Sequence, residues 1–159
     1  MSTVTKIDGI GTRKDGSGGE SVNFNTNKRF VRLYASATLT KGDAVCLDTS
    51  ISTYGLMNNV AKADVDASAT KQAIGIAAES VTVSGTDYQL VSIQVGGICT
   101  FAVLDDLSDA VGDLVAAGSD PPGSLTLDVA AALPVGIIVA EGTANTADST
   151  VYLLNPANL

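Results

Sequence analysis

Two Gly-Asp pairs are the residues of this sequence that first invite a chemical interpretation. One lies in Lys41-Gly42-Asp43, a tripeptide that resembles an integrin-recognition sequence, and the other lies in Val111-Gly112-Asp113. The second copy keeps the Gly-Asp pair and lacks the basic residue, which favours a structural role over a receptor ligand. Gly adopts backbone conformations closed to other residues, and Asp caps turns by bonding nearby amides. We therefore predict structural turns at Gly42, Asp43, Gly112 and Asp113.

Acidic side chains gather just before the second pair, at Asp105, Asp106, Asp109 and Asp113. Calcium loops place Asp or Asn at alternate positions, with a Gly for the sharp turn and a distal Glu. This spacing does not meet that pattern, so a solvated turn is expected. A hydrolytic pair of carboxylates would normally be accompanied by aromatic or polar binding residues. With only four Tyr, three Phe and no Trp, the chain offers few aromatic ones.

The sequence has few of the residues that other kinds of catalytic site need. The sequence contains no His, which removes Ser-His and Cys-His catalysis and the commonest transition-metal ligand. Cys46 and Cys99 lie inside apolar runs, too far apart for a zinc site, and are expected to be buried free thiols, with a disulfide as the alternative. The Gly-rich stretch 11–19 lacks the Gly-Lys-Ser/Thr ending of a phosphate loop. We expect no enzyme activity, and no catalytic, cofactor-binding or metal-ligating residue is assigned.

Composition narrows the function classes further. The formal net charge of −8 argues against nucleic-acid binding by the body of the protein, because neutralising phosphates needs clustered Lys and Arg. No apolar run approaches the roughly 18–20 residues that span a bilayer, and the start of the chain shows no secretory signal, so no membrane partner is expected. Charged residues make up only 16% of the chain, a low fraction that suits extracellular, virion or assembly proteins.

Charge is divided unevenly along the chain. Residues 1–29 hold five basic and three acidic groups, for a net charge of +2, whereas the remaining residues carry −10. Gly and polar residues dominate 11–19, and such a segment buries too little apolar surface to order itself. We interpret 1–29 as an extended or disordered basic arm that contacts a partner, with a plain disordered tail as the alternative. Its candidate contacts are Lys6, Arg13, Lys14, Lys28 and Arg29.

The remainder, 30–159, has the pattern of a β-rich body. Many short runs rich in β-branched residues alternate with Gly, Asn, Asp and Pro clusters, which predicts an all-β fold, a small β-barrel or sandwich. In 90–95, Val91, Ile93 and Val95 alternate with Ser92 and Gln94, the period of a strand with one buried face. Only 64–72 has the composition of a short helix. The predicted strands are 30–35, 44–47, 73–77, 89–95, 98–103, 113–116, 125–127, 135–139 and 150–154.

The strands follow one order twice. After the Gly-Asp turn and strand at 39–48 come AIGIAAESV and then VSIQVGG. After the turn and strand at 107–116 come LPVGIIVAEG and then STVYLLN. We interpret this as an internal pseudo-repeat over about 35–101 and 105–155. The glycines inside the second strand of each copy indicate a bulge or a close backbone approach.

These segments together resemble a family of tailed-bacteriophage capsid cement (head decoration) proteins. The resemblance covers roughly 33–155 and is carried by ASATLTKGDAVCLD (35–48), AIGIAAE (73–79), VGGICT (95–100), VGDLVA (111–116), VGIIVAE (135–141) and VYLL (151–154). It implies a non-enzymatic structural protein on the outer surface of the virion. Its partners would be the major capsid protein and other copies of itself, typically in trimers, and it would hold the expanded shell against internal pressure.

Two other functions remain open at this stage. A host- or glycan-binding module, such as a head-fibre or adhesin domain, would expose aromatic rings on a sheet face. The tyrosines, at positions 34, 54, 88 and 152, are scattered through the sequence, which counts weakly against it. A carboxylate-based hydrolase would need paired acids in a cleft.

Overall fold

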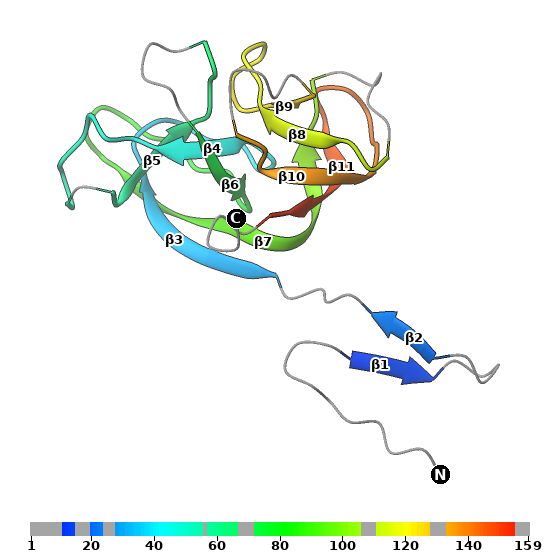
Figure 1. Ribbon diagram of the computed structural model, residues 1–159. Coiled ribbons are helices and arrows are strands. Elements are labelled where there is room, and N and C mark those ends of the chain that lie inside the picture. Colours follow the sequence, from blue (N-terminus) through cyan, green and yellow to red (C-terminus); the bar gives the residue numbers. More distant parts are fainter. Residues whose placement is uncertain are drawn as a thin grey trace.

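The computed structural model describes residues 11–14, 20–23, 28–55, 57–66, 72–105, 111–127 and 133–154. The protein is all-β, and the described residues contain no helix. Figure 1 shows the strands gathered into one body, with β1 and β2 apart from it. The strands are β1 (Gly11–Lys14), β2 (Glu20–Asn23), β3 (Arg29–Ala35), β4 (Ala44–Leu47), β5 (Asn59–Lys62), β6 (Ala73–Ala77), β7 (Gln89–Val103), β8 (Leu114–Ala117), β9 (Leu125–Thr126), β10 (Gly136–Ala140) and β11 (Ala147–Leu153).

Five strands close a small barrel, which we call the first unit (29–95). The sheet runs in the order β3-β5-β4-β6-β7, and β3 also pairs with β7, so that the ends of the sheet meet. All pairings in it are antiparallel except the one between β3 and β5. Its interior is filled by small and branched side chains, among them Val45, Ala77 and Ile93. The sequence therefore predicted the fold class correctly, including a barrel built without Trp.

The remaining strands repeat this pairing order in a second unit (97–154). The C-terminal half of β7 takes the place of β3 and pairs antiparallel with β11, which is followed across the sheet by β10, β8 and β9. A parallel bridge between Leu104 and Leu125 joins the end of β7 to β9, as the parallel pairing joins β3 to β5. The pairings place the boundary between the two units inside β7, which both units share.

The two Gly-Asp turns have the same backbone conformation and make equivalent backbone hydrogen bonds. Gly42 and Gly112 have φ of 99° and 100°, the left-handed region that favours glycine. The Gly42 N–H donates to the Ala77 carbonyl at 2.9 Å, and the Gly112 N–H donates to the Ile138 carbonyl at 2.8 Å. The return bonds also correspond, since the N–H groups of Ala77 and Ile138 donate to the carbonyls of the two Asp residues. Both Gly-Asp pairs thus lie where a turn leads into a strand.

The glycines in the middle of the repeated segments mark close approaches, also as expected. A Cβ on Gly75 would meet the backbone carbonyl of Gln94, and a Cβ on Gly136 would meet the side chain of Val151. Gly75 and Gly136 occupy equivalent places, each paired with a Val of the preceding Gly-Asp strand. Neighbouring strands are thus drawn together at the same point of both units.

The two units differ in what covers their outer faces. In the first unit Ala44, Ile76 and Gln94 form a cross-strand row that points away from the barrel interior, because each is adjacent to an inward-pointing residue. All three are fully buried, and Ala44 and Ile76 belong to a buried cluster that residues of both units share. The second unit therefore packs over this row. Gln94 lies on the polar face expected from the alternation, yet it is fully buried, and its side-chain amide donates to the Gly96 carbonyl at 3.2 Å.

Some local predictions need correction. β5 was not predicted, and the runs 89–95 and 98–103 form one continuous strand, β7, that bends at Gly97 with a φ of 79°. Residues 64–66 form a turn rather than the start of a helix, and 67–71 lie outside the described residues. In the arm, β1 and β2 form an antiparallel pair, while 1–10, 15–19 and 24–27 lie outside the described residues.

Candidate functional site

Asp43 of the Lys-Gly-Asp tripeptide is held inside the structure. Its carboxylate accepts a hydrogen bond from the Thr40 N–H at 2.7 Å and forms an ion pair with Lys62 at 3.0 Å. The residue is only 7% exposed. The Lys41 ammonium lies elsewhere, 5.0 Å from the centre of the Phe101 ring. Because a receptor would need access to this carboxylate, the geometry supports the turn and not the ligand motif.

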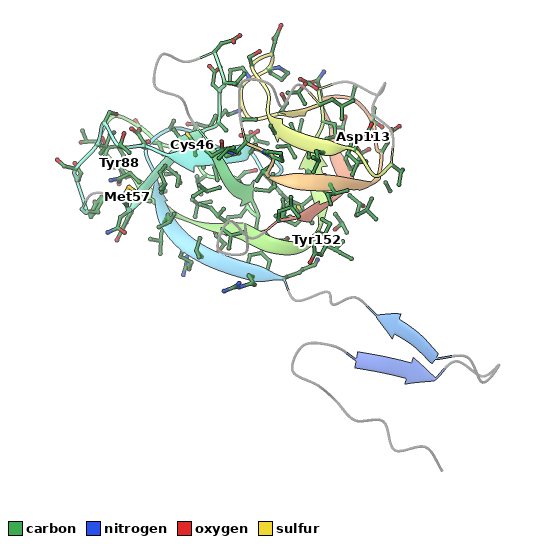
Figure 2. The ribbon with its side chains drawn as sticks, in the orientation of Figure 1. Cys46, Met57, Tyr88, Asp113 and Tyr152 are labelled. Atoms are coloured by element: carbon green, nitrogen blue, oxygen red, sulfur yellow. The ribbon has the colours of Figure 1, made fainter. Side chains whose placement is uncertain are left out.

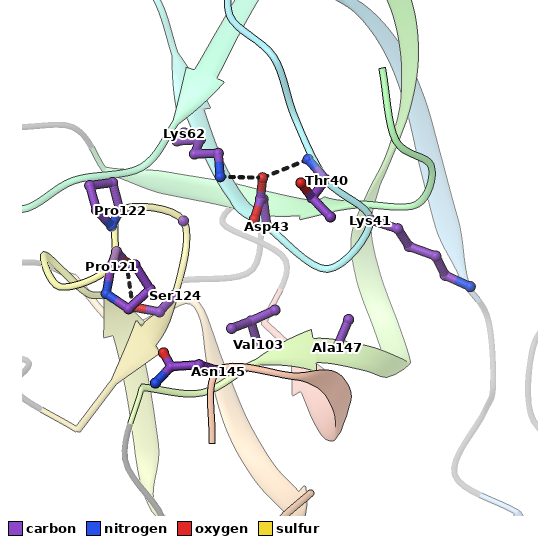
Figure 3. Close-up of a pocket in the computed structure, with 11 residues that line it drawn as sticks. Thr40, Lys41, Asp43, Lys62, Val103, Pro121, Pro122, Ser124, Asn145 and Ala147 are labelled. Atoms are coloured by element: carbon purple, nitrogen blue, oxygen red, sulfur yellow. Dashed lines mark hydrogen bonds and ion pairs between the residues drawn. The ribbon is translucent and has the colours of Figure 1, made fainter. Parts of the chain in front are cut away.

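A pocket of about 240 Å³ lies where the two units meet (Figure 3). The first unit contributes the turn at 40–43 and Lys62, and the second contributes the loop at 121–124, Asn145 and Ala147. The Ser124 hydroxyl donates to the Pro121 carbonyl at 2.8 Å, and Asp43 is engaged by Lys62. Figure 3 shows Lys41 extending away from this ion pair. These polar groups are engaged within their own units, and no nucleophile is paired with a base among the described residues that line the pocket.

The two cysteines are buried and form no disulfide, which confirms the prediction made from their apolar surroundings. Burial raises the pKa of the Cys99 thiol from 9.0 to about 11, and this outweighs the lowering effects of the Phe101 backbone, Lys28 and Lys41. The thiol is therefore protonated at neutral pH. Cys46 donates from sulfur to the Ala61 carbonyl at 3.7 Å. The Cys99 environment favours packing over nucleophilic chemistry.

The candidate contacts of the arm fall in different places. Lys6 lies outside the described residues, and Arg13 and Lys14 lie on β1. Lys28 and Arg29 are exposed where the chain enters the body, and Arg29 pairs with Gly96 of β7. A Cβ on Gly96 would contact the Arg29 side chain at 3.5 Å, which places the aliphatic stem of Arg29 over this glycine. The base of the arm is thus fixed at the strand shared by both units.

Three of the four tyrosines form a cluster that the sequence did not reveal. The rings of Tyr34 and Tyr54 stack with centroids 4.0 Å apart and an interplanar angle of 13°, and Tyr88 meets Tyr54 edge-on at 6.3 Å. Tyr54 is 51% exposed, and Met57 beside it is 54% exposed. Figure 2 shows Tyr88 and Met57 at the same end of the first unit, far from Tyr152. We call Tyr34, Tyr54 and Tyr88 the tyrosine cluster.

The loop that carries Tyr54 is held from inside by Asn59. The Asn59 side-chain amide donates to the carbonyls of Ile51, Thr53 and Gly55, at 3.0, 2.8 and 3.3 Å. Asn59 is fully buried. Tyr54 and Met57 both have positive φ, 66° and 69°, conformations that non-Gly residues rarely adopt. Such strain persists only where the surroundings enforce it, so the exposed side chains are presented by a pre-organised loop.

A second apolar surface lies on the outer face of the second unit. Leu114 pairs with Ile137, Ile137 with Tyr152, and Tyr152 with Ile98, in one row across four strands. Leu114 is 43% exposed and Tyr152 41% exposed, while the other two are partly buried. Figure 2 shows Tyr152 on β11 at this side of the protein. We call Leu114, Ile137, Tyr152 and Ile98 the second-unit row.

Within the described residues, no group of three or more Cys, Asp or Glu side chains could hold a metal ion. Asp106 and Asp109 of the acidic stretch lie outside those residues. The described part of the chain also contains no helix long and apolar enough to cross a membrane. No protein-family model matches the sequence, and the search of curated proteins returns no match either.

Proposed function

We propose that the protein is a non-enzymatic structural protein of a phage virion that binds the outer surface of the capsid and stabilises the expanded shell. The observation that carries the proposal is that the segments resembling cement proteins are the ones that build the doubled body. The two Gly-Asp turns and the Gly-containing strands β6 and β10 are matched between the units. These residues therefore serve architecture, as a cement protein requires, and leave binding to outer surfaces and the arm.

The partners in this proposal are the major capsid protein and further copies of the same chain, in a trimer by the resemblance. Nucleic acid and membranes are not among the partners. The arm would supply part of the contact, because its net charge of +2 complements acidic surface and its base at Lys28 and Arg29 is exposed. Many weak contacts spread over several shell subunits become strong together, since each raises the effective concentration of the next.

Removing residues 1–27 is expected to lower occupancy on expanded heads at least about tenfold, because the contacts of Lys6, Arg13 and Lys14 are lost together while Lys28 and Arg29 stay in place. The cut leaves β3 intact, since its pairing with β7 begins at Arg29. Co-sedimentation with expanded and unexpanded heads measures the occupancy. An equal melting temperature for the truncated and full-length proteins serves as the control for folding. Undiminished binding of the truncated protein would contradict the role of the arm.

The tyrosine cluster favours a second candidate function, a host- or glycan-binding module. Sugars stack on exposed aromatic faces, and Tyr54 is half exposed on a pre-organised loop. The tyrosines that looked scattered in sequence meet here because β3 and β7 are neighbours, with Tyr34 directly opposite Leu90. The exposed ring of Tyr54 lies on a loop rather than on the sheet face expected of such a module.

Tyr54→Ala is expected to raise the Kd for a recognised oligosaccharide at least about tenfold, if the cluster is a sugar platform. Isothermal titration with oligosaccharides from bacterial cell walls and capsules measures the affinity. Tyr152→Ala is the matched control, because Tyr152 has similar exposure and lies outside the cluster. Binding by none of these oligosaccharides, or equal loss in both variants, would rule out this function for the cluster.

A further inference from the structure

The first half of β3 lies at the outer side of the first unit with both of its faces open (Figure 1). Residues 29–32 are all exposed, whereas their partners Ile93 and Gln94 on β7 are fully buried. Side chains of a strand alternate between its two faces, so four exposed residues in succession mean that neither face is covered. Phe30 is 49% exposed and Val31 is 38% exposed. One apolar side chain therefore faces solvent on each side of the strand.

One edge of this segment has no partner strand. β3 pairs with β7 along its whole length, but on its other side β5 pairs only with Tyr34 and Ala35. The Tyr34 N–H donates to the Asn58 carbonyl at 2.8 Å, so the backbone groups of Tyr34 point toward this second side. Because the orientation repeats every two residues, the N–H and C=O groups of Phe30 and Arg32 point the same way. Among the described residues, no strand or bridge pairs with them there.

Open edges are commonly protected against stray pairing by charged side chains, prolines or bulges. Protection alone would account for Arg29 and Arg32, which are both exposed. It does not account for Phe30 and Val31, because exposed apolar side chains make an edge more prone to pairing. An added strand would pair with the open backbone groups and cover part of both apolar side chains.

We propose that the open edge of β3, residues 29–33, binds an extended acidic segment of a partner protein, which adds to the sheet as a further strand. The segment would exchange hydrogen bonds with the N–H and C=O groups of Phe30 and Arg32. About five residues, or roughly 17 Å of extended chain, fill the edge up to the place where Asn58 leads into β5. Within the proposed function this segment belongs to the shell, and that identification rests on the proposed function.

Charge identifies the occupant as acidic. Lys28, Arg29 and Arg32 are three exposed cations within five positions, and no carboxylate of the described residues forms an ion pair with them. Opposite charges on neighbouring strands stabilise a sheet, whereas like charges directly opposite each other destabilise it. The arm of another copy is a poorer fit, because β1 would bring Arg13 and Lys14 against these cations.

The test is the binding of short labelled peptides to the purified full-length protein at physiological salt, measured by fluorescence anisotropy. A peptide of about eight residues that alternates Thr and Glu should bind at least about tenfold more tightly than one that alternates Thr and Lys. The acidic peptide N-methylated at two adjacent central residues keeps its charge but loses a donor on each edge, so its affinity should fall at least about tenfold. No binding of the acidic peptide at about 1 mM, or equal affinity for any two of these peptides, would overturn the proposal.

Arg32→Glu should lower the affinity for the acidic peptide at least about tenfold and raise that for the basic peptide, because it reverses the charge on the edge itself. Lys41→Glu is the matched control, since Lys41 is an exposed cation on the Gly-Asp turn, outside β3. Equal weakening by both variants would overturn the proposal, because overall charge would then attract the peptide. A tenfold gain in affinity on removal of residues 1–27 would also overturn it, because the arm would then be the occupant.

The peptide measurements do not involve the shell, so they are separate from the capsid-binding function. Expanded heads that bind the wild-type protein and Arg32→Glu equally would overturn the shell as the source of the segment and leave capsid binding intact. If the wild-type protein binds no heads, the capsid-binding function fails, and the peptides still decide whether the edge of β3 accepts an acidic strand.

Discussion

Replacing Gly42 by alanine is expected to lower the free energy of unfolding by about 2–6 kcal/mol. The residue has a φ of 99°, a conformation that costs a non-Gly residue about 1–3 kcal/mol. A Cβ there would also lie 2.6 Å from the Phe101 carbonyl oxygen and 2.6 Å from the Ala147 Cβ, both in the second unit. Overpacking of this kind adds about 1–3 kcal/mol, since the two units would have to move apart. Urea denaturation measures the loss.

The variant Gly112→Ala separates the cost of the backbone conformation from the cost of overpacking. Gly112 occupies the equivalent turn with a φ of 100°, but a Cβ there meets no described atom within 4 Å. This variant should lose only the backbone contribution, about 1–3 kcal/mol. The difference between the two variants therefore measures how tightly the units are joined at Gly42. Equal losses in the free energy of unfolding would contradict this packing. They would show that Phe101 and Ala147 can move away from a Cβ at position 42 at no energetic cost.

The barrel was predictable because most of its strands show their buried face directly in the sequence. The strand at 44–47 and the strand at 73–77 were predicted with the bounds that the structure has. β5 was missed because it is short and opens with Asn59, a residue type typical of turns. The predicted strands 89–95 and 98–103 leave a break at Gly96 and Gly97. In the structure it is the point where β7 passes from one unit to the other.

The candidate surfaces were less predictable, since they depend on what lies across from each strand. Alternation places Gln94 and Tyr152 on outward faces, but it cannot say that the fold buries Gln94 and leaves Tyr152 exposed. The tyrosine cluster joins a strand end, a loop and a residue just before β7, which are separated by 20 and 34 positions in sequence. Only the pairing of β3 with β7 and β5 brings these segments together.

Asn59→Asp should destabilise the protein by about 3 kcal/mol or more at neutral pH, although it changes a single group. The Asn59 amide donates to three loop carbonyls from a fully buried position. A carboxylate would set negative oxygen against those carbonyls, and a buried charge without donors is among the costliest defects in a fold. The loop would lose its internal support, so the Tyr34–Tyr54 stacking should weaken with it. Denaturant unfolding and tyrosine fluorescence report the two effects.

The loss from Asn59→Asp should depend on pH in a defined direction. Burial among carbonyls should raise the pKa of the introduced carboxyl in the folded state above its unfolded value of about 3.9. A group of this kind favours folding when protonated, so the penalty should shrink as the pH falls toward about 4 and be largest at neutral pH. Asn58→Asp is the matched control, because Asn58 is exposed and, among the described residues, its side-chain amide donates to the Tyr54 carbonyl; its replacement should cost under about 1 kcal/mol. A pH-independent loss, or equal losses at the two neighbouring positions, would mean that Asn59 does not hold the tyrosine-bearing loop from within.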